Sequence, residues 1–141
     1  MAAGAPTIPP TREFTFLGVT YGLFAFGLIA FWPAVVGVLL AYIRRDDAAG
    51  TFLESHYRWL IRTFWWWALL FIVITCTMAA AIVPDAVRMG IKIDSGGAVN
   101  IPWSMLATAV VGGLALAVVW FWVIYRLIRG AIRLSDGQPA P

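Results

Sequence analysis

The sequence predicts an all-α, polytopic membrane protein folded as a helical bundle. We expect a helical hairpin, or one long kinked helix, and then two long spans, with a cytoplasmic juxtamembrane amphipathic segment before the first span. Of 141 residues, 62% are hydrophobic and 12% charged, whereas roughly a quarter are charged in soluble domains. Residues 14–43, 63–83 and 103–125 carry no charge, and each stretch exceeds the ~18 residues that indicate a membrane helix.

The first uncharged stretch favours a hairpin. Residues 1–11 are small and proline-rich, which predicts a disordered lead. The 30 residues that follow from position 14 are too long for one upright span and short for two, because a span needs roughly 17 or more residues. Pro33 can begin a new helix, and Gly27 weakens the end of the preceding one. We therefore predict helices at about 12–30 and 33–46, in preference to a single helix kinked at Pro33.

The segment that follows, residues 44–62, contains seven of the seventeen charged residues. Thr51 and Glu54 have the spacing of a capping box, and Glu54 and Arg58 can pair along one side of a helix. The charges nearly balance, so we expect Asp46 or Asp47, together with Glu54, to hold Arg58 and Arg62 in a folded cytoplasmic cap. The apolar side of this helix is predicted to lie at the lipid surface; it carries Leu53, Tyr57, Leu60 and Phe64. The predicted structural motif comprises Arg45, Asp46, Gly50, Thr51, Glu54, Ser55, His56, Arg58 and Arg62.

Two long helices complete the prediction, at 51–83 and 103–135. The first contains a span at 63–83 and is expected to end at Pro84, and its tryptophans at 65–67 are placed at headgroup level. The second contains a span at 103–125. Residues 136–141 are predicted to be a disordered tail, which leaves 12–135 as a single transmembrane domain. Seven arginines flank the inner ends of the spans, against Arg88 and Lys92 in the intervening loop, so the central motif and the C-terminus are predicted to be cytoplasmic.

Few residues indicate a chemical site. His56 is the only histidine, and we weigh it as a weak haem or quinone ligand against an imidazole bonded to Asp46 or Asp47. No metal-ligand spacing, catalytic constellation or nucleic-acid motif is present, so no cofactor is predicted and the protein is not expected to be an enzyme. Cys76 is a lone cysteine within an apolar span and forms no internal disulfide.

Two stripes on the last helix indicate contacts instead. Ala109, Gly113 and Ala117 recur every four residues, a spacing that lets another helix approach closely. We expect them to pack internally against Cys76, Ala79 and Ala80, and an oligomer or a partner subunit is the alternative. The second stripe is basic and is predicted to reach lipid headgroups; it consists of Arg126, Arg129 and Arg133.

The central stretch, RRDDAAGTFLESHYRWLIRTFWW, resembles small bacterial membrane proteins that are classified as a domain of unknown function and grouped with the chloroplast inner-envelope translocon-channel-like superfamily. The resemblance covers about residues 14–83 and implies a compact, mostly four-helix membrane protein with its motif on the cytoplasmic side. It implies protein translocation only by distant analogy. The matching positions are Arg45 and Asp46, Gly50 and Thr51, Glu54 to His56, and Arg62 to Trp65.

These observations predict a non-catalytic subunit in a bacterial inner (cytoplasmic) membrane. We expect it to act through helix–helix contacts as an accessory or assembly subunit of a larger complex, with membrane lipids and other membrane subunits, or its own copies, as partners. An oligomeric channel or protein-translocation component is the alternative. A haem or quinone site shared with a partner through His56 is the weaker alternative.

Overall fold

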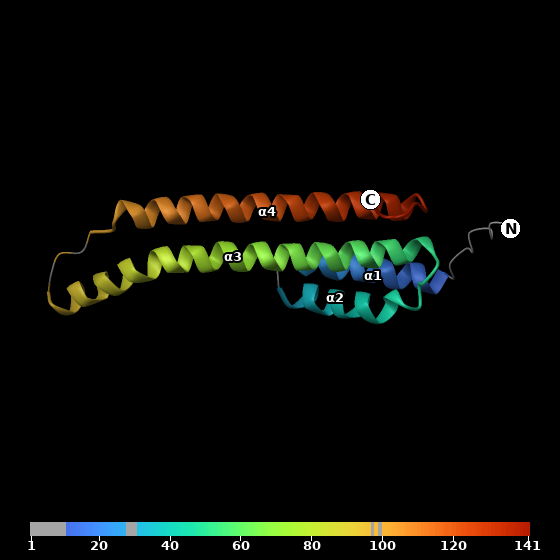
Figure 1. The fold of residues 1–141 in the computed structure, drawn as a ribbon, viewed down its shortest axis with the longest axis horizontal. Helices are drawn as coiled ribbons and strands as arrows, with labels where there is room; N and C mark the ends of the chain where they lie inside the picture. The colour runs from blue at the N-terminus through green and yellow to red at the C-terminus, as the bar shows by residue number, and fades with distance from the viewer. Residues whose placement is uncertain (1–10, 28–30, 97, 99) are drawn as a thin grey trace. The chain divides into compact units, whose positions relative to one another are not determined.

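The computed structural model describes residues 11–27, 31–96, 98 and 100–141 and contains four α-helices in that part of the chain. They are α1 (Thr11–Gly27), α2 (Phe31–Arg45), α3 (Phe52–Asp94) and α4 (Trp103–Ser135) (Figure 1). No strand occurs among the described residues, so the all-α prediction is confirmed. The lead predicted to be disordered falls almost entirely on residues 1–10, which lie outside the described residues.

The first two helices form a hairpin. α1 ends at Gly27, where an added Cβ would meet the backbone of Ala34 on α2. A Cβ at Gly37 would likewise meet the ring of Phe24 on α1. The two helices therefore pack closely through glycines, and the alternative of a single kinked helix is wrong. Pro33 lies within the first turn of α2, where its missing N–H costs no intrahelical hydrogen bond.

The third helix is longer than predicted. α3 continues through Pro84 to Asp94, so the expectation that it ends at position 83 is wrong. A proline inside a helix removes one backbone hydrogen bond and does not prevent the next turn from forming, especially in apolar surroundings. Here the next turn is held by an ion pair between Arg88 and Asp85 at 3.4 Å, and Asp85 also accepts a hydrogen bond from Ser104 at 3.0 Å.

The chain divides into two compact units. The first comprises residues 1–66 and 122–141, and brings α1, α2 and the start of α3 together with the end of α4. Leu17, Leu53 and Tyr57 are fully buried in it, and Phe24 meets Phe64 edge to face at 6.1 Å. The apolar side of residues 51–64 is therefore buried against protein, and the prediction that it lies at the lipid surface is wrong. α1 supplies apolar partners for this side, as the contact of Phe24 with Phe64 shows.

The second unit comprises residues 67–121 and contains the rest of α3 and α4. α3 and α4 are each long and apolar enough to cross a membrane, and none of the most apolar stretch of α3 is buried within the chain. Gly112 on α4 lies against Met78 on α3, where an added Cβ would overlap the thioether. Apart from such contacts, large side chains in this unit are mostly exposed; they include Leu69, Ile72, Val110, Val111, Leu114 and Val118. This exposure is the pattern expected of helices that face lipid or other membrane helices.

Candidate functional site

A buried histidine connects three parts of the first unit. His56, on the start of α3, has no exposed surface. Its Nδ1 lies 3.0 Å from the Tyr21 hydroxyl on α1, and its Nε2 lies 2.9 Å from the backbone carbonyl of Gln138, beyond α4. The sequence hypothesis that Asp46 or Asp47 bonds this imidazole is wrong, because both aspartates pair with neighbouring arginines.

The partners of His56 determine its tautomer. A carbonyl oxygen only accepts hydrogen bonds, so Nε2 carries the proton and Nδ1 accepts from the Tyr21 hydroxyl. Burial lowers the pKa of His56 below its ordinary value, although the bond to Gln138 opposes the shift. A neutral imidazole with both nitrogens occupied offers no free lone pair to a haem or metal. The geometry thus favours a structural role for His56 over the ligand role weighed above.

The C-terminal segment lies against the start of α3. The Ala140 N–H donates to the Ser55 hydroxyl at 2.8 Å, which in turn donates to the Phe52 carbonyl at 2.6 Å. Arg133 donates to the Pro139 carbonyl at 3.4 Å. The sequence predicts disorder for residues 136–141, and the structure differs because the His56 and Ser55 side chains on α3 provide hydrogen-bond partners for this backbone.

Arg126 is half-buried in the first unit. Its Nε donates to the Thr63 hydroxyl at 2.9 Å, and its guanidinium stacks on the Trp59 ring at 3.5 Å from the centroid. Arg126 therefore differs from the rest of the predicted basic stripe in that Thr63 and Trp59 on α3 hold its side chain, and the contact of the stripe with headgroups stays a prediction. Arg129 is exposed and donates to the Tyr125 hydroxyl at 3.1 Å.

The charged motif is held largely by local pairs. Glu54 and Arg58 form the predicted ion pair at 2.6 Å. The predicted capping box does not form: Glu54 accepts from the Gly50 N–H at 3.2 Å rather than from the Thr51 N–H, and the Thr51 hydroxyl donates to the Ala48 carbonyl instead of accepting from the Glu54 N–H. The Gly50 N–H lowers the pKa of Glu54, and Arg58 acts in the same direction. Arg62 does not join these carboxylates as predicted; its guanidinium instead lies 5.6 Å from the Trp59 ring centroid.

The small-residue stripe on α4 is exposed. Ala109, Gly113 and Ala117 do not contact α3 as the internal-packing expectation requires, and Cys76, Ala79 and Ala80 on α3 are exposed too. The expectation fails because α4 is rotated so that Gly112, next to Gly113, meets Met78. The built Cβ of Gly113 has no atom within 4 Å.

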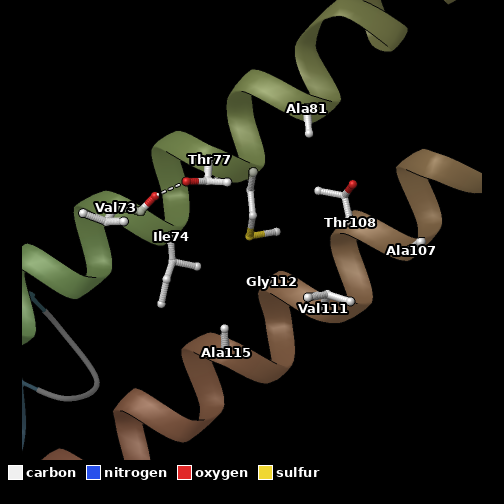
Figure 2. A pocket seen from close by; sticks show the side chains of 10 residues that line it. Val73, Ile74, Thr77, Ala81, Ala107, Thr108, Val111, Gly112 and Ala115 are labelled. Atoms are coloured by element: carbon white, nitrogen blue, oxygen red, sulfur yellow. Dashed lines mark hydrogen bonds between the residues drawn. The ribbon is translucent and has the colours of Figure 1, made fainter.

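Where the two helices do meet, an apolar groove of about 450 Å³ remains (Figure 2). Ile74 and Met78 line it from α3, and Thr108 and Gly112 line it from α4. The Thr77 hydroxyl is turned back to the Val73 carbonyl at 2.7 Å. The groove therefore offers mainly hydrocarbon contact to whatever lies beside it.

No group of three or more histidine, cysteine, aspartate or glutamate side chains that could hold a metal ion occurs in the described part of the chain. Sequence reasoning identified His56 and Arg126 but missed their partners, which are Tyr21 for His56 and Thr63 and Trp59 for Arg126. Polar side chains inside otherwise apolar helices were the signal that could have found Tyr21 and Thr63, because such groups need a partner when buried.

Comparison with protein families, with curated proteins and with solved structures finds no match to this chain. The resemblance of its central motif to translocon-channel-like membrane proteins stays a prediction.

Proposed function

We propose that this chain is a non-catalytic integral membrane subunit that acts through helix–helix contacts in a larger complex. Its membrane-crossing stretches are 63–83 and 103–125. It resides in a bacterial inner membrane, with the motif of residues 44–62 and the C-terminus in the cytoplasm, as the distribution of arginines favours.

The observation that carries this proposal is the exposed stripe of Ala109, Gly113 and Ala117. In a bilayer, helices associate through close van der Waals packing, which small residues at four-residue spacing permit. Within the second unit this stripe is uncovered, and the glycine that does pack internally is Gly112. The stripe is thus free to receive a helix from another chain.

The test is native mass spectrometry of the tagged chain extracted from its own membranes in mild detergent. We expect unrelated subunits in a fixed ratio, and we expect Gly113→Leu to reduce their recovery by about tenfold, as loss of close helix packing worth about 1.4 kcal/mol would do. The open space around Gly113 means that this variant should leave the chain itself folded.

Val118→Leu is the matched control, because it enlarges another exposed side chain of α4 away from the stripe. Recovery of a bare monomer, or equal losses from both variants, would contradict the proposal. A homo-oligomer would instead favour the alternative of a channel or translocation component, and conductance in planar bilayers would then be the next measurement.

A further inference from the structure

Two arginines lie against one indole in the first unit. The guanidinium carbon of Arg126 lies 3.5 Å from the Trp59 ring centroid, and that of Arg62 lies 5.6 Å from the same centroid. Neither arginine forms an ion pair with a carboxylate among the residues the structure describes. Like charges held this close repel each other unless an anion lies between or beside them.

The same place contains buried hydrogen-bond donors that lack acceptors. Trp59 is 9% exposed, and its Nε1 is buried with no partner in the described part of the chain. The Nη2 of Arg126 is buried and unpartnered in the same way. Buried donors are nearly always satisfied by protein, water or a ligand, so the surroundings of Trp59 are short of acceptors among the described residues.

A cavity of about 290 Å³ adjoins this indole. Trp59 and Arg62 line it, and so do Glu54 and Arg58. Glu54 and Arg58 pair with each other at 2.6 Å, so their charges offset. Arg62 is then the lining side chain whose charge has no opposite partner among the described residues, and Arg126, which does not line the cavity, adds a second positive charge from its place on the Trp59 ring. These charges favour an anion in the cavity.

We propose that this cavity binds a phosphate group, with Arg62 donating to its oxygens and Arg126 supplying a second positive charge through its place on Trp59. Guanidinium matches phosphate because its planar set of donors can engage two oxygens together. The phosphate can belong to an anionic lipid headgroup or to a free phosphate. The lipid source rests on the membrane placement proposed above, whereas binding of the phosphate group itself does not.

The test uses the purified full-length chain in mild non-ionic detergent. Native mass spectrometry would measure retention of phosphatidylglycerol against phosphatidylcholine, and calorimetry would measure binding of inorganic phosphate. We expect Arg62→Gln to weaken binding by about tenfold, the usual size of one charge-assisted contact. Arg62 is exposed, so the variant should fold, and its circular dichroism should match that of the wild type.

Arg88→Gln is the matched control, since it removes the same charge from an exposed arginine that does not line this cavity. Unchanged binding in this variant, with loss in Arg62→Gln, supports a defined site. Equal loss in both variants would show general attraction to positive charge and overturn the proposal.

The remaining outcomes distinguish the two sources of phosphate and show whether the ligand is an anion or a cation. Selective retention of phosphatidylglycerol supports the lipid source, and heat from inorganic phosphate supports the free anion. The absence of both results would overturn the proposal. Glu54→Gln removes the carboxylate from the cavity and should tighten binding severalfold; weaker binding would indicate a cation site instead. These measurements use the isolated chain, so a failure of the subunit proposal would leave them unaffected.

Discussion

The hydrogen bond between Tyr21 and His56 connects α1 to α3 across 35 residues, and its removal gives a quantitative test of the first unit. Tyr21 is 7% exposed and His56 is fully buried. If His56 is replaced by leucine, which has a similar volume, the Tyr21 hydroxyl loses its acceptor and has no access to water. An unsatisfied buried hydroxyl costs about 1–3 kcal/mol.

The second partner of His56 should contribute less. Gln138 is exposed, so water can replace the imidazole at its carbonyl.

Replacing Tyr21 by phenylalanine leaves Nδ1 of His56 without a donor, again at a cost of about 1–3 kcal/mol. In the double variant neither group is present, so its cost should fall below the sum of the single costs. We expect a coupling energy of about 1–2 kcal/mol between Tyr21 and His56.

The assay is unfolding by sodium dodecyl sulfate in mild detergent, followed by circular dichroism, for the wild type, both single variants and the double variant. Tyr42→Phe is a suitable control because its hydroxyl pairs with Trp65 on the exposed surface, at 2.9 Å. Its replacement should change stability far less than that of Tyr21. Additivity of the two single variants within about 0.5 kcal/mol would refute the buried hydrogen bond.

Three further predictions follow from particular residues. Burial lowers the pKa of folded His56, so at pH values below the ordinary histidine pKa of about 6.5 the unfolded chain binds more protons than the folded chain. The free energy of unfolding should therefore decrease as the pH falls below that value. A wild type with pH-independent stability, or an equal pH effect in His56→Leu, would contradict this. Gly130→Ala should destabilise the protein, despite the better helix propensity of alanine, because the new Cβ would meet the Tyr21 side chain. Gly113→Ala places its Cβ in open space and should be neutral or stabilising by up to about 1 kcal/mol. A change in stability of the same sign at both positions in unfolding assays would count against the packing described. Cys76 is exposed at the surface of the chain, and the proposed 63–83 span would place it in lipid. A charged maleimide should therefore label it slowly in intact membranes and fully after denaturation, and rapid labelling in membranes would place it in water.

Local features of the fold could be predicted because they depend on neighbours in sequence. The hairpin of α1 and α2 follows from a run too long for one span with glycine and proline near its middle. The pair of Glu54 and Arg58 follows from four-residue spacing on a helix. Pro84 misled the prediction of the end of α3, since a proline marks a probable boundary and packing decides whether the helix continues.

Contacts between distant residues could not be predicted in this way. His56 is hydrogen-bonded to residues 35 and 82 positions away, and Arg126 is bonded to a residue 63 positions away. Nothing in the spacing of these residues identifies their partners, since each partner depends on how whole helices pack.

The sequence by itself determined that the chain is helical, strongly apolar and charged mainly around one central segment, because composition and periodicity are properties of the chain alone. Only the tertiary structure decided which faces are covered: Gly112 packs and Gly113 does not, and Arg126 is half-buried against Thr63 while Arg129 is exposed. The physical reason is that a helix apolar on all sides carries no polarity signal that separates a protein-facing side from a lipid-facing one. The rotation of each helix is then set by steric fit with its neighbours.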